Sequence, residues 1–371
     1  MSEIKYQPFL KVAKDITSKF TKIKKQDYLE NGKYKIIDQS QNFITGYTNN
    51  QQFINNEEKE IIIFGDHTRV IKYIDFPIAI GADGVKVLKV DSKIANTKYI
   101  YYFLKSVKLH NAGYSRHFKY LKAIKIPIQP LENQRKISAF LTRLEELIEK
   151  RKESIKLLDE LIKSTFLDMF GDPVLNTKGW DKKILQNMMT IRRGASPRPI
   201  KDFIGNDIHW IKIGDGTKGD ELYITDTKEK IKMDGKTKSV YLKEGSVIFA
   251  NCGVSLGFVR ILKIDGCIHD GWLSFEKIDN ETLNKIFLLK VINFSTKYLR
   301  RIASGGTQPN LNTSIMNKFK IIVPPKPLQD KFAKIVTKIE DTKKLYQNSL
   351  DELNNLFNSI AQKAFKGEVL K

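Results

Sequence analysis

Cysteine is nearly absent from this sequence: Cys252 and Cys267 are the two thiols in 371 residues. Two thiols at that spacing fit neither a disulfide scaffold nor a zinc ribbon, and they are typical of a reducing compartment. No stretch approaches the roughly 18 consecutive apolar residues of a membrane span, and no apolar core follows Met1 to Lys5 as in a secretory signal. We therefore expect a cytoplasmic protein with no membrane partner.

Motifs of catalysis are also missing. A methyltransferase needs a glycine-rich cofactor turn and an Asn- or Asp-Pro-Pro-aromatic motif, but the sequence at 323–326 is Val-Pro-Pro-Lys. An ATP-driven motor needs Gly-x-x-x-x-Gly-Lys-Ser/Thr, and no Lys-Ser/Thr follows the glycines at 214–219. The five histidines, at positions 67, 110, 117, 209 and 269, lack the spacing of metal ligands. We expect no catalytic centre, no metal and no cofactor.

Positive charge is the largest excess in the composition: 64 Lys and Arg face 42 Asp and Glu, a formal net charge of +22. A general lysine bias could raise that count without any binding role. The charge is unevenly spread, however, because residues 132–171 are neutral overall and residues 329–371 carry +2. The remaining +20 belongs to two regions that these segments separate. Such a distribution favours basic lobes that bind a polyanion such as nucleic acid.

The two charge-balanced segments have the apolar spacing of long helices. In the first, apolar side chains recur at alternating steps of four and three residues, with interruptions at Arg151 and Thr165; they are Ile137, Leu141, Leu144, Ile148, Ile155, Leu158, Ile162 and Met169. The second has Phe332, Ile335, Ile339, Thr342, Tyr346, Ser349, Leu353, Leu356 and Ile360. Each predicted helix has about 35 residues and a length on the order of 50 Å. We expect the two to pack on each other; the alternative is that each docks separately on its own domain.

The sequence shows an internal repeat, and each copy ends in one of the long helices. The prolines that open the helices, Pro127 and Pro130 in one copy and Pro324 and Pro327 in the other, align at an offset of 197 residues. Shorter matches occur in the same order: Leu10 to Ile16 with Leu185 to Ile191, Phe64-Gly65-Asp66 with Phe249-Ala250-Asn251, Asp83-Gly84 with Asp270-Gly271, and Phe170-Gly171 with Phe365-Lys366-Gly367. The pattern predicts a two-fold duplication.

The rest of each copy is predicted to be mixed α and β, so we expect an α+β protein. Short runs rich in β-branched residues predict strands at 59–64, 85–90 and 124–128, and at 208–213, 246–250, 258–264 and 319–323. Helices are expected at 99–108 and 283–302. The predicted domains are 1–129, a central long helix at 130–172, a second domain at 173–324, and a distal long helix at 325–371.

Several short motifs, taken in order, resemble the specificity (S) subunits of type I restriction-modification systems. They are Phe64 to Arg69, Asp75-Phe76-Pro77, Gly81 to Gly84, Pro130 to Gln134, Leu158 to Leu161, Met169 to Pro173, Gly179-Trp180, Arg192 to Pro199, and Gln362 to Glu368. The resemblance covers essentially the whole chain. One departure is Lys331, where the second helix opening lacks the expected Gln.

The resemblance implies a fold and a set of partners. It implies two target recognition domains, each reading one half of a split site in double-stranded DNA. The two long helices would pair as an antiparallel coiled coil that acts as spacer and as docking surface for methyltransferase subunits, two of them, and restriction subunits would be further partners. The chain itself would be a non-catalytic recognition subunit.

Polar, basic stretches outside the predicted core are the candidates for DNA contact. Arg suits guanine, and Gln or Asn suits adenine, through paired hydrogen bonds. The candidates of the second half are Arg192, Arg193, Ser196, Arg198, Thr307, Gln308, Asn310 and Asn312. Those of the first half are Gln39, Gln41, Asn42, His67, Arg69, Ser115, Arg116, His117 and Lys119. Other roles stay open: Arg192 and Arg193 as phosphate binders, Asn310 and Asn312 as helix caps, and His67 as a scaffold residue.

Two functions follow from these features. The favoured one is a subunit that reads a bipartite DNA sequence and positions partner enzymes. The alternative is a coiled-coil scaffold whose basic lobes bind nucleic acid without sequence preference. Both predict salt-sensitive binding, but only the first predicts a large affinity ratio between one duplex and random DNA.

Overall fold

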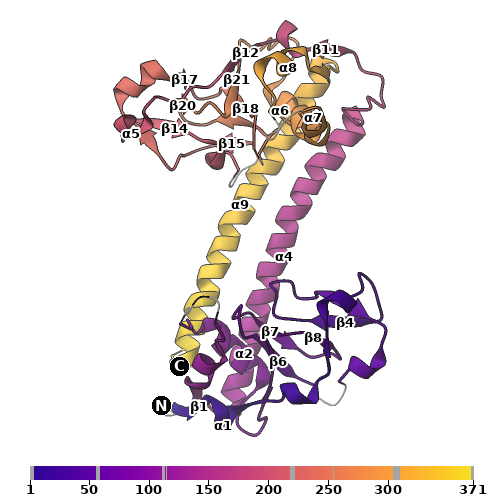
Figure 1. Cartoon of the computed structure of the whole chain (residues 1–371), viewed down its shortest axis with the longest axis vertical. Coiled ribbons are helices and arrows are strands. Elements are labelled where there is room, and N and C mark those ends of the chain that lie inside the picture. The colour runs from indigo at the N-terminus through magenta and orange to yellow at the C-terminus, as the bar shows by residue number, and fades with distance from the viewer. Residues whose placement is uncertain are drawn as a thin grey trace. The chain divides into compact units, whose positions relative to one another are not determined.

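The computed structural model describes residues 4–55, 59–110, 113, 115–217, 222–253, 255–303 and 310–368. The chain forms two compact units: unit 1 comprises residues 1–154 and 346–371, and unit 2 comprises residues 155–345. Figure 1 shows strands and short helices in both units, and two long helices that contribute to both. Across the described ranges, no helix is both long and apolar enough to cross a membrane.

Unit 1 contains two four-stranded sheets. One sheet has the order β2 (Ala13–Asp15), β9 (Val85–Val90), β6 (Ile61–Gly65), β7 (Ile71–Ile74), and the other β3 (Lys22–Ile23), β8 (Ala79–Gly81), β4 (Tyr34–Ile37), β5 (Gly46–Thr48). A ribbon of β1 (Lys5–Pro8) and β10 (Lys125–Ile128) and the helices α1 (Phe9–Val12), α2 (Thr97–Ser106) and α3 (Phe118–Lys122) complete it. Strand β6 is buried on both faces: Ile62 and Phe64 join the core under α2, whereas Ile61 and Ile63 join the core between the sheets. Such double burial explains its unbroken apolar run.

Unit 2 has the same kinds of elements. It contains two five-stranded sheets. The first has the order β12 (Thr190–Arg193), β21 (Trp272–Glu276), β18 (Val247–Ala250), β19 (Val259–Leu262), β15 (Tyr223–Ile224). The second has the order β13 (Ile204–Gly205), β16 (Lys230–Ile231), β14 (Ile208–Ile211), β20 (Gly266–Ile268), β17 (Val240–Leu242). A ribbon of β11 (Lys182–Ile184) and β22 (Lys320–Ile322) and the helices α5 (Ile200–Phe203), α6 (Lys285–Phe294), α7 (Thr296–Ile302) and α8 (Thr313–Lys318) accompany them. Strand β18 alternates between two cores, as β6 does: Val247 and Phe249 face one, Ile248 and Ala250 the other. The seven predicted strands and both predicted helical stretches are confirmed, with small shifts in their ends.

The two predicted long helices are also confirmed: α4 spans Leu131–Phe170 and α9 spans Lys326–Phe365, 40 residues each. In unit 1, the first part of α4 shares a core with the last part of α9. In unit 2, the last part of α4 shares a core with the first part of α9. Arg151, an interruption of the predicted apolar stripe, lies with its guanidinium 4.3 Å from the centre of the Tyr346 ring.

In the first half of α4, the apolar residues predicted to face inward are buried. Near the helix ends, some of the predicted inward positions are wrong. Leu356, predicted to be inside, is exposed. Its neighbour Phe357 is half-buried instead, with its ring 5.9 Å from that of Tyr102 on α2. Phe166 and Phe170, outside the predicted stripe, are fully buried. The reason is that near their ends the long helices face α2 and α6 as well as each other, so a second face becomes apolar.

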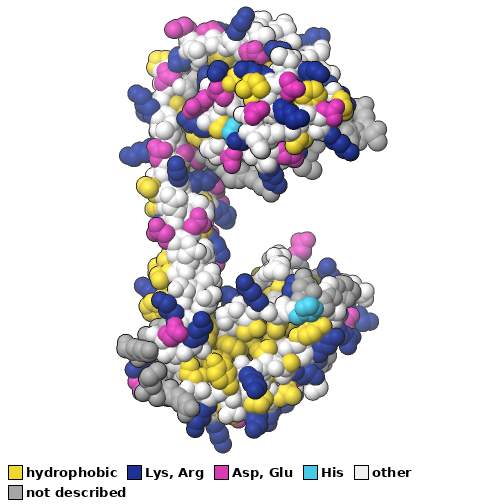
Figure 2. Space-filling model, turned by 90° about the vertical axis from the view of Figure 1, so that its left-hand side faces the viewer, with side chains coloured by type: hydrophobic (Ala, Val, Ile, Leu, Met, Phe, Trp, Pro, Cys, Tyr) yellow, Lys and Arg dark blue, Asp and Glu magenta, His cyan; other side chains and the backbone are white. Residues whose placement is uncertain are grey.

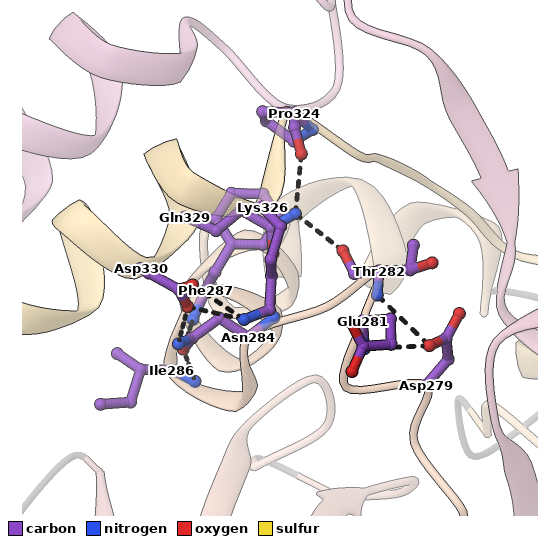
Figure 3. Close-up of polar contacts among 10 residues, drawn as sticks. All are labelled: Asp279, Glu281, Thr282, Asn284, Ile286, Phe287, Pro324, Lys326, Gln329 and Asp330. Atoms are coloured by element: carbon purple, nitrogen blue, oxygen red, sulfur yellow. Dashed lines mark hydrogen bonds and ion pairs between the residues drawn. The ribbon is translucent and has the colours of Figure 1, made fainter.

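A buried glutamine fixes the first turn of each long helix to the globular fold. In unit 2, the side-chain amide of Gln329 donates to the carbonyl oxygens of Thr282 (3.0 Å) and Pro324 (2.8 Å). Its side-chain oxygen accepts the backbone N–H of Asn284 at 2.9 Å, and Asn284 in turn caps α6 (Figure 3). All three bonds are to main-chain groups, so the glutamine joins the loop at 282–284 to the start of α9 whatever the side chains there.

The same arrangement occurs in unit 1. Gln134 donates to the carbonyl oxygens of Ile94 (3.2 Å) and Gln129 (2.7 Å) and accepts the N–H of Asn96 (2.8 Å), which caps α2. Each glutamine is the fourth residue of its helix, an offset of 195 residues. The expectation that the second helix opening lacks its glutamine was therefore wrong. Aligning the prolines placed Lys331 opposite Gln134, two residues beyond the residue that makes the bonds.

Aromatic rings fasten the other end of each long helix. In unit 2, Phe170 of α4 packs edge-on against Phe287 of α6, with ring centres 4.9 Å apart. In unit 1, Phe365 of α9 packs in the same way against Tyr99 of α2, at 5.2 Å. Each unit therefore holds the first residues of one long helix and the last residues of the other.

Replacing Gln134 by Ala should destabilise unit 1 by about 2–4 kcal/mol, because buried main-chain groups of Ile94, Asn96 and Gln129 lose their partner. Urea unfolding of the full chain, followed by hydrogen exchange of each unit, measures the effect. The control Gln362→Ala, on the exposed face of α9, should change stability by less than about 0.5 kcal/mol. Equal stability of the two variants would contradict the anchoring role.

Candidate nucleic-acid interface

Four of the eight basic side chains of α4 are paired within the helix. Ion pairs three or four residues apart join Lys136 with Glu132, Arg143 with Glu146, Lys152 with Glu149, and Lys156 with Glu160. Figure 2 shows acidic and basic side chains mixed along the helices, whereas basic side chains predominate on the visible face of unit 1. Since residues 132–171 and 329–371 together carry +2 of the net charge of +22, the excess positive charge that a polyanion requires belongs to the globular parts of the chain.

In unit 2, the loop that follows β12 is held tightly against the turn between β20 and β21. The N–H of Gly194 donates to the carbonyl oxygen of Trp272 (2.8 Å), and that of Ala195 to Ile268 (3.1 Å). A Cβ at Gly194 would lie 2.3 Å from the carbonyl oxygen of His269, so only glycine allows this approach. The loop at 194–199 thus has a fixed position next to this turn.

Asp270, in that turn, brings three of the predicted residues together. Its carbonyl oxygen accepts from Nε of Arg193 at 3.0 Å. Its carboxylate accepts from the hydroxyl of Ser196 at 3.2 Å, and lies 3.5 Å from Nη2 of Arg198. Arg192, the residue before Arg193 on β12, has an exposed side chain. The sequence did not point to Asp270 as part of this site, because an acidic residue in a basic loop carries no motif.

Asn310 lies beside the same turn. It forms an isolated β-bridge with Cys252, and the N–H of Leu311 donates to the carbonyl oxygen of Asn251 at 2.8 Å. Asn251 in turn donates its N–H to Gly271, next to Asp270. Thr307 and Gln308 lie outside the described residues.

Asn312 has the capping role that the sequence left open. Its side-chain oxygen accepts the N–H of Ile315 at 3.0 Å, at the first turn of α8. A side chain committed to a cap orients its helix but has less freedom to follow a base edge. Asn310 is the better candidate of the two for DNA contact.

In unit 1, Gln39 ties two loops together. Its side-chain oxygen accepts the N–H of His67 (3.1 Å) and its amide donates to the carbonyl oxygen of Asp83 (3.1 Å). The hydroxyl of Thr68 donates to the carbonyl oxygen of Gln39 at 2.6 Å. Gln39 therefore serves the scaffold, and brings the loop that holds Gln41 and Asn42 beside the turn at 65–70.

Lys72, which sequence reasoning missed, holds that loop from inside. Lys72 is 4% exposed, and its ammonium donates to the carbonyl oxygens of Asp38 (2.9 Å), Asn42 (2.5 Å) and Phe43 (3.5 Å). Burial lowers the pKa of Lys72, partly offset by the carboxylate of Asp38. The signal in the sequence is a lysine at an inward position of β7, where an apolar residue is expected. Gln41 and Asn42 remain exposed on the outside of the loop.

His117 is not a DNA contact: its side chain is fully buried, so it cannot reach a ligand at the surface. Its ring nitrogen Nδ1 lies 3.0 Å from the carbonyl oxygen of Asp66, which also accepts the N–H of His117 at 2.8 Å. The carboxylate of Asp66 accepts the N–H of Phe118 at 2.7 Å. The neighbours Arg116 and Lys119 are exposed, so they flank a fixed anchor.

Three other predicted residues of unit 1 lie near these loops, and all three are half-buried. Ser115 is half-buried beside Arg116, and His67 and Arg69 are half-buried in the turn at 65–70. Arg69 has a φ of 61°, a left-handed conformation that fixes a tight turn. The structure thus brings Gln39, His67 and Arg69 into one region and leaves Gln41 and Asn42 on its surface.

The two loop regions offer guanidinium, ammonium, amide and hydroxyl groups, which bind by charge and hydrogen bonds. Within the part of the chain that the structure describes, no group of three or more His, Cys, Asp or Glu is placed to hold a metal ion. Burial raises the pKa of the thiols of Cys252 and Cys267, so both are protonated at neutral pH.

Replacing Lys72 by Met should free the loop at 38–43, because the variant keeps the side chain's length but loses its charged hydrogen bonds. If the free energy of opening the loop falls by roughly 1.5–3 kcal/mol, amide exchange in the loop should be about ten to a hundred times faster. Hydrogen exchange measured by mass spectrometry tests this. Lys14→Met, on the exposed side of β2, is the matched control and should leave exchange unchanged. Unchanged exchange in Lys72→Met would mean that the lysine does not hold the loop.

This chain is similar to known proteins in sequence and in fold. The Type I restriction enzyme MjaIX specificity subunit of Methanocaldococcus jannaschii is 25% identical over 273 residues, which cover 67% of this chain and 61% of that protein. The HindI specificity subunit of Haemophilus influenzae is 28% identical over 198 residues, which cover 52% of this chain and 42% of that protein. The chain therefore spans less than two thirds of the length of these two relatives.

A solved structure, that of the type I restriction-modification system S subunit from M. genitalium, superposes with a TM-score of 0.65 at 17% identity. The superposition covers 98% of this chain and 96% of that one, and at this identity it concerns the fold alone. The model of one family, described as Type I restriction modification DNA specificity domain, matches residues 13–157 and again residues 177–355. Since these two matches cover most of the sequence, the chain belongs to the family of type I restriction modification DNA specificity domains.

Proposed function

We propose that this chain is the specificity subunit of a type I restriction-modification complex: it recognises a bipartite DNA site and positions methyltransferase subunits on it, with restriction subunits as further partners. The observation that carries the proposal is that each family match contains an exposed polar loop with a fixed position: the amide-bearing loop held by the buried Lys72, and the basic loop held by the half-buried Asp270. Fixed loops favour base reading, because a preorganised side chain loses less entropy on binding. The chain itself would be non-catalytic and would act in the cytoplasm, where its DNA and its partner enzymes are.

The proposal includes a two-fold duplication with domains at 1–129, 130–172, 173–324 and 325–371. Gln134 and Gln329 make equivalent bonds at an offset of 195 residues, which supports it. A second pair of equivalent bonds supports it too: Asp66 donates its N–H to Gly84, and Asn251 donates its N–H to Gly271. Each copy would be one target recognition domain followed by one long helix.

We also propose that α4 and α9 form an antiparallel coiled coil that spaces the two domains. The ion pair between Lys343 of α9 and Asp159 of α4, with 2.5 Å between Nζ and Oδ1, supports this pairing in unit 2. The contact of Arg151 with Tyr346 supports it in unit 1. The alternative function, a scaffold that binds nucleic acid without sequence preference, would use the same helices but would not need fixed loops.

The docking surface for methyltransferase subunits would include an exposed apolar stripe on α4. The large apolar side chains Phe140, Leu147, Leu157 and Leu161 are exposed there. At 100° per residue these four positions fall within an arc of about 100°, next to the stripe that faces α9. Exposed apolar side chains gathered on one helix face are typical of a protein interface.

The recognition role is tested by expressing the chain with its methyltransferase partner in a host that lacks adenine methylation. Sequencing then maps the methylated adenines. We expect one bipartite motif with a fixed nonspecific spacer. Methylation scattered over unrelated sequences would contradict the proposal and favour the scaffold alternative.

The docking stripe is tested by the double variant Phe140→Ser, Leu147→Ser. Loss of two apolar contacts should weaken association with the methyltransferase subunit about ten- to a hundredfold, measured by titration calorimetry. Leu175→Ser, which removes an even more exposed apolar side chain in the loop after α4, should leave association unchanged. Equal affinities of the double variant and the wild type would exclude this face of α4.

A further inference from the structure

Asp270 places a carboxylate inside the basic loop region of unit 2. Its side chain is 29% exposed, whereas Arg198, 3.5 Å away, is 80% exposed. The contacts are divided between its atoms: Oδ1 accepts from Ser196, Oδ2 faces Arg198, and the main-chain oxygen accepts from Arg193. One residue thus orders three candidate DNA contacts.

The neighbouring His269 leaves these contacts in place at neutral pH. Its Nδ1 lies 2.8 Å from Oδ1 of Asp270 and 3.0 Å from the N–H of Gly271, and one nitrogen cannot donate to the first and accept from the second at once. Burial lowers the pKa of His269, against the pull of Asp270, so the neutral ring is favoured. A carboxylate oxygen has two lone pairs, so Oδ1 of Asp270 can accept from the hydroxyl of Ser196 in either tautomer of the neutral ring.

A carboxylate is unfavourable next to DNA phosphates, since like charges 4 Å apart repel by about 1 kcal/mol even at the dielectric constant of water. A loop that only bound phosphates would be better without it. The guanidinium of Arg198, however, has five donors in a planar fork. With Nη2 facing Asp270 at 3.5 Å, the other donors of the fork remain available to the paired acceptors O6 and N7 of guanine.

We propose that Asp270 is a specificity-determining positioning residue: it orients Arg198 toward the major-groove edge of a guanine, and its charge weakens the attraction of the same loop for phosphates. The inference rests on the proposed function, and concerns one base pair of the half-site read by unit 2. It gives Ser196 a supporting role, as the donor that fixes the carboxylate from its other oxygen.

The two effects have opposite signs, which separates them from a merely structural role. Asp270→Asn removes one negative charge, so the affinity for a random duplex should rise about two- to fivefold. The same change releases Arg198, so discrimination at one G·C pair should fall about ten- to a hundredfold. A structural defect would lower both affinities together.

The experiment uses the full chain in complex with its methyltransferase partner. The duplexes are the bipartite site taken from the methylated adenines, a series with each base pair of it substituted in turn, and a random duplex of equal length. Arg198→Ala should lose preference at the same G·C pair, and adding Asp270→Asn to it should cost no further discrimination. Arg198→Lys keeps the charge but lacks the fork, so it should lose that preference and keep the affinity for random DNA.

The matched control is Asp265→Asn, which removes the same charge elsewhere in unit 2, where Asp265 pairs with Lys243. It should leave every base preference unchanged. Preferences at the other half-site should stay the same in all variants. Unchanged discrimination in both Asp270→Asn and Arg198→Lys would overturn the inference. It would also be overturned if Asp270→Asn lost a preference for cytosine whether or not Arg198 is present, because Asp270 would then read the base itself. Absence of any bipartite preference in the wild type would instead contradict the proposed function.

Discussion

The rest of the structure depends on the two buried glutamines that attach the long helices to the globular units. Gln134 and Gln329 each bond three main-chain groups: the N–H of a helix-capping asparagine and two carbonyl oxygens. Because these partners are backbone atoms, the attachment does not constrain the side chains around it. Surface loops elsewhere in each unit can therefore change in sequence without loosening the helices.

In each candidate interface, one charged side chain holds the groups that are exposed at the surface. This side chain is a lysine in unit 1 and an aspartate in unit 2, so the two charges are opposite. In unit 1, the buried ammonium of Lys72 gathers three carbonyl oxygens under the loop that presents Gln41 and Asn42. In unit 2, the carboxylate of Asp270 gathers hydroxyl and guanidinium groups. The first arrangement orients amides and the second orients cations, so under the proposed function the two units would recognise different base edges.

The sequence predicted the elements well because their causes are local. Runs of β-branched residues predicted β6 and β18, and the regular apolar spacing predicted α4 and α9. The sequence also predicted that the candidate loops lie at the surface, since basic and glycine-bearing segments have no place in a core. It did not predict that Ser196, Arg198 and Asn310 come to lie by one turn.

What the sequence could not predict depends on contacts between distant residues. Ser196 and Asp270 are 74 residues apart, and nothing in either segment indicates their hydrogen bond. His117 lies in a polar, basic stretch that is typical of a surface, and only the fold shows that its side chain is buried against Asp66. Gln329 was missed because prolines were used to align the repeat, although the bonding residue is fixed by the start of the helix instead.

Under the proposed function, each unit reads its own half of a split DNA site. The most direct test is equilibrium binding of the complex to four duplexes that carry both half-sites, the first alone, the second alone, or neither, over a range of salt concentrations. The account predicts that both half-sites together bind at least about a thousandfold more tightly than neither, with additive contributions from each. Added salt should weaken all four while this ratio persists. Equal affinities for the four duplexes at every salt concentration would contradict it.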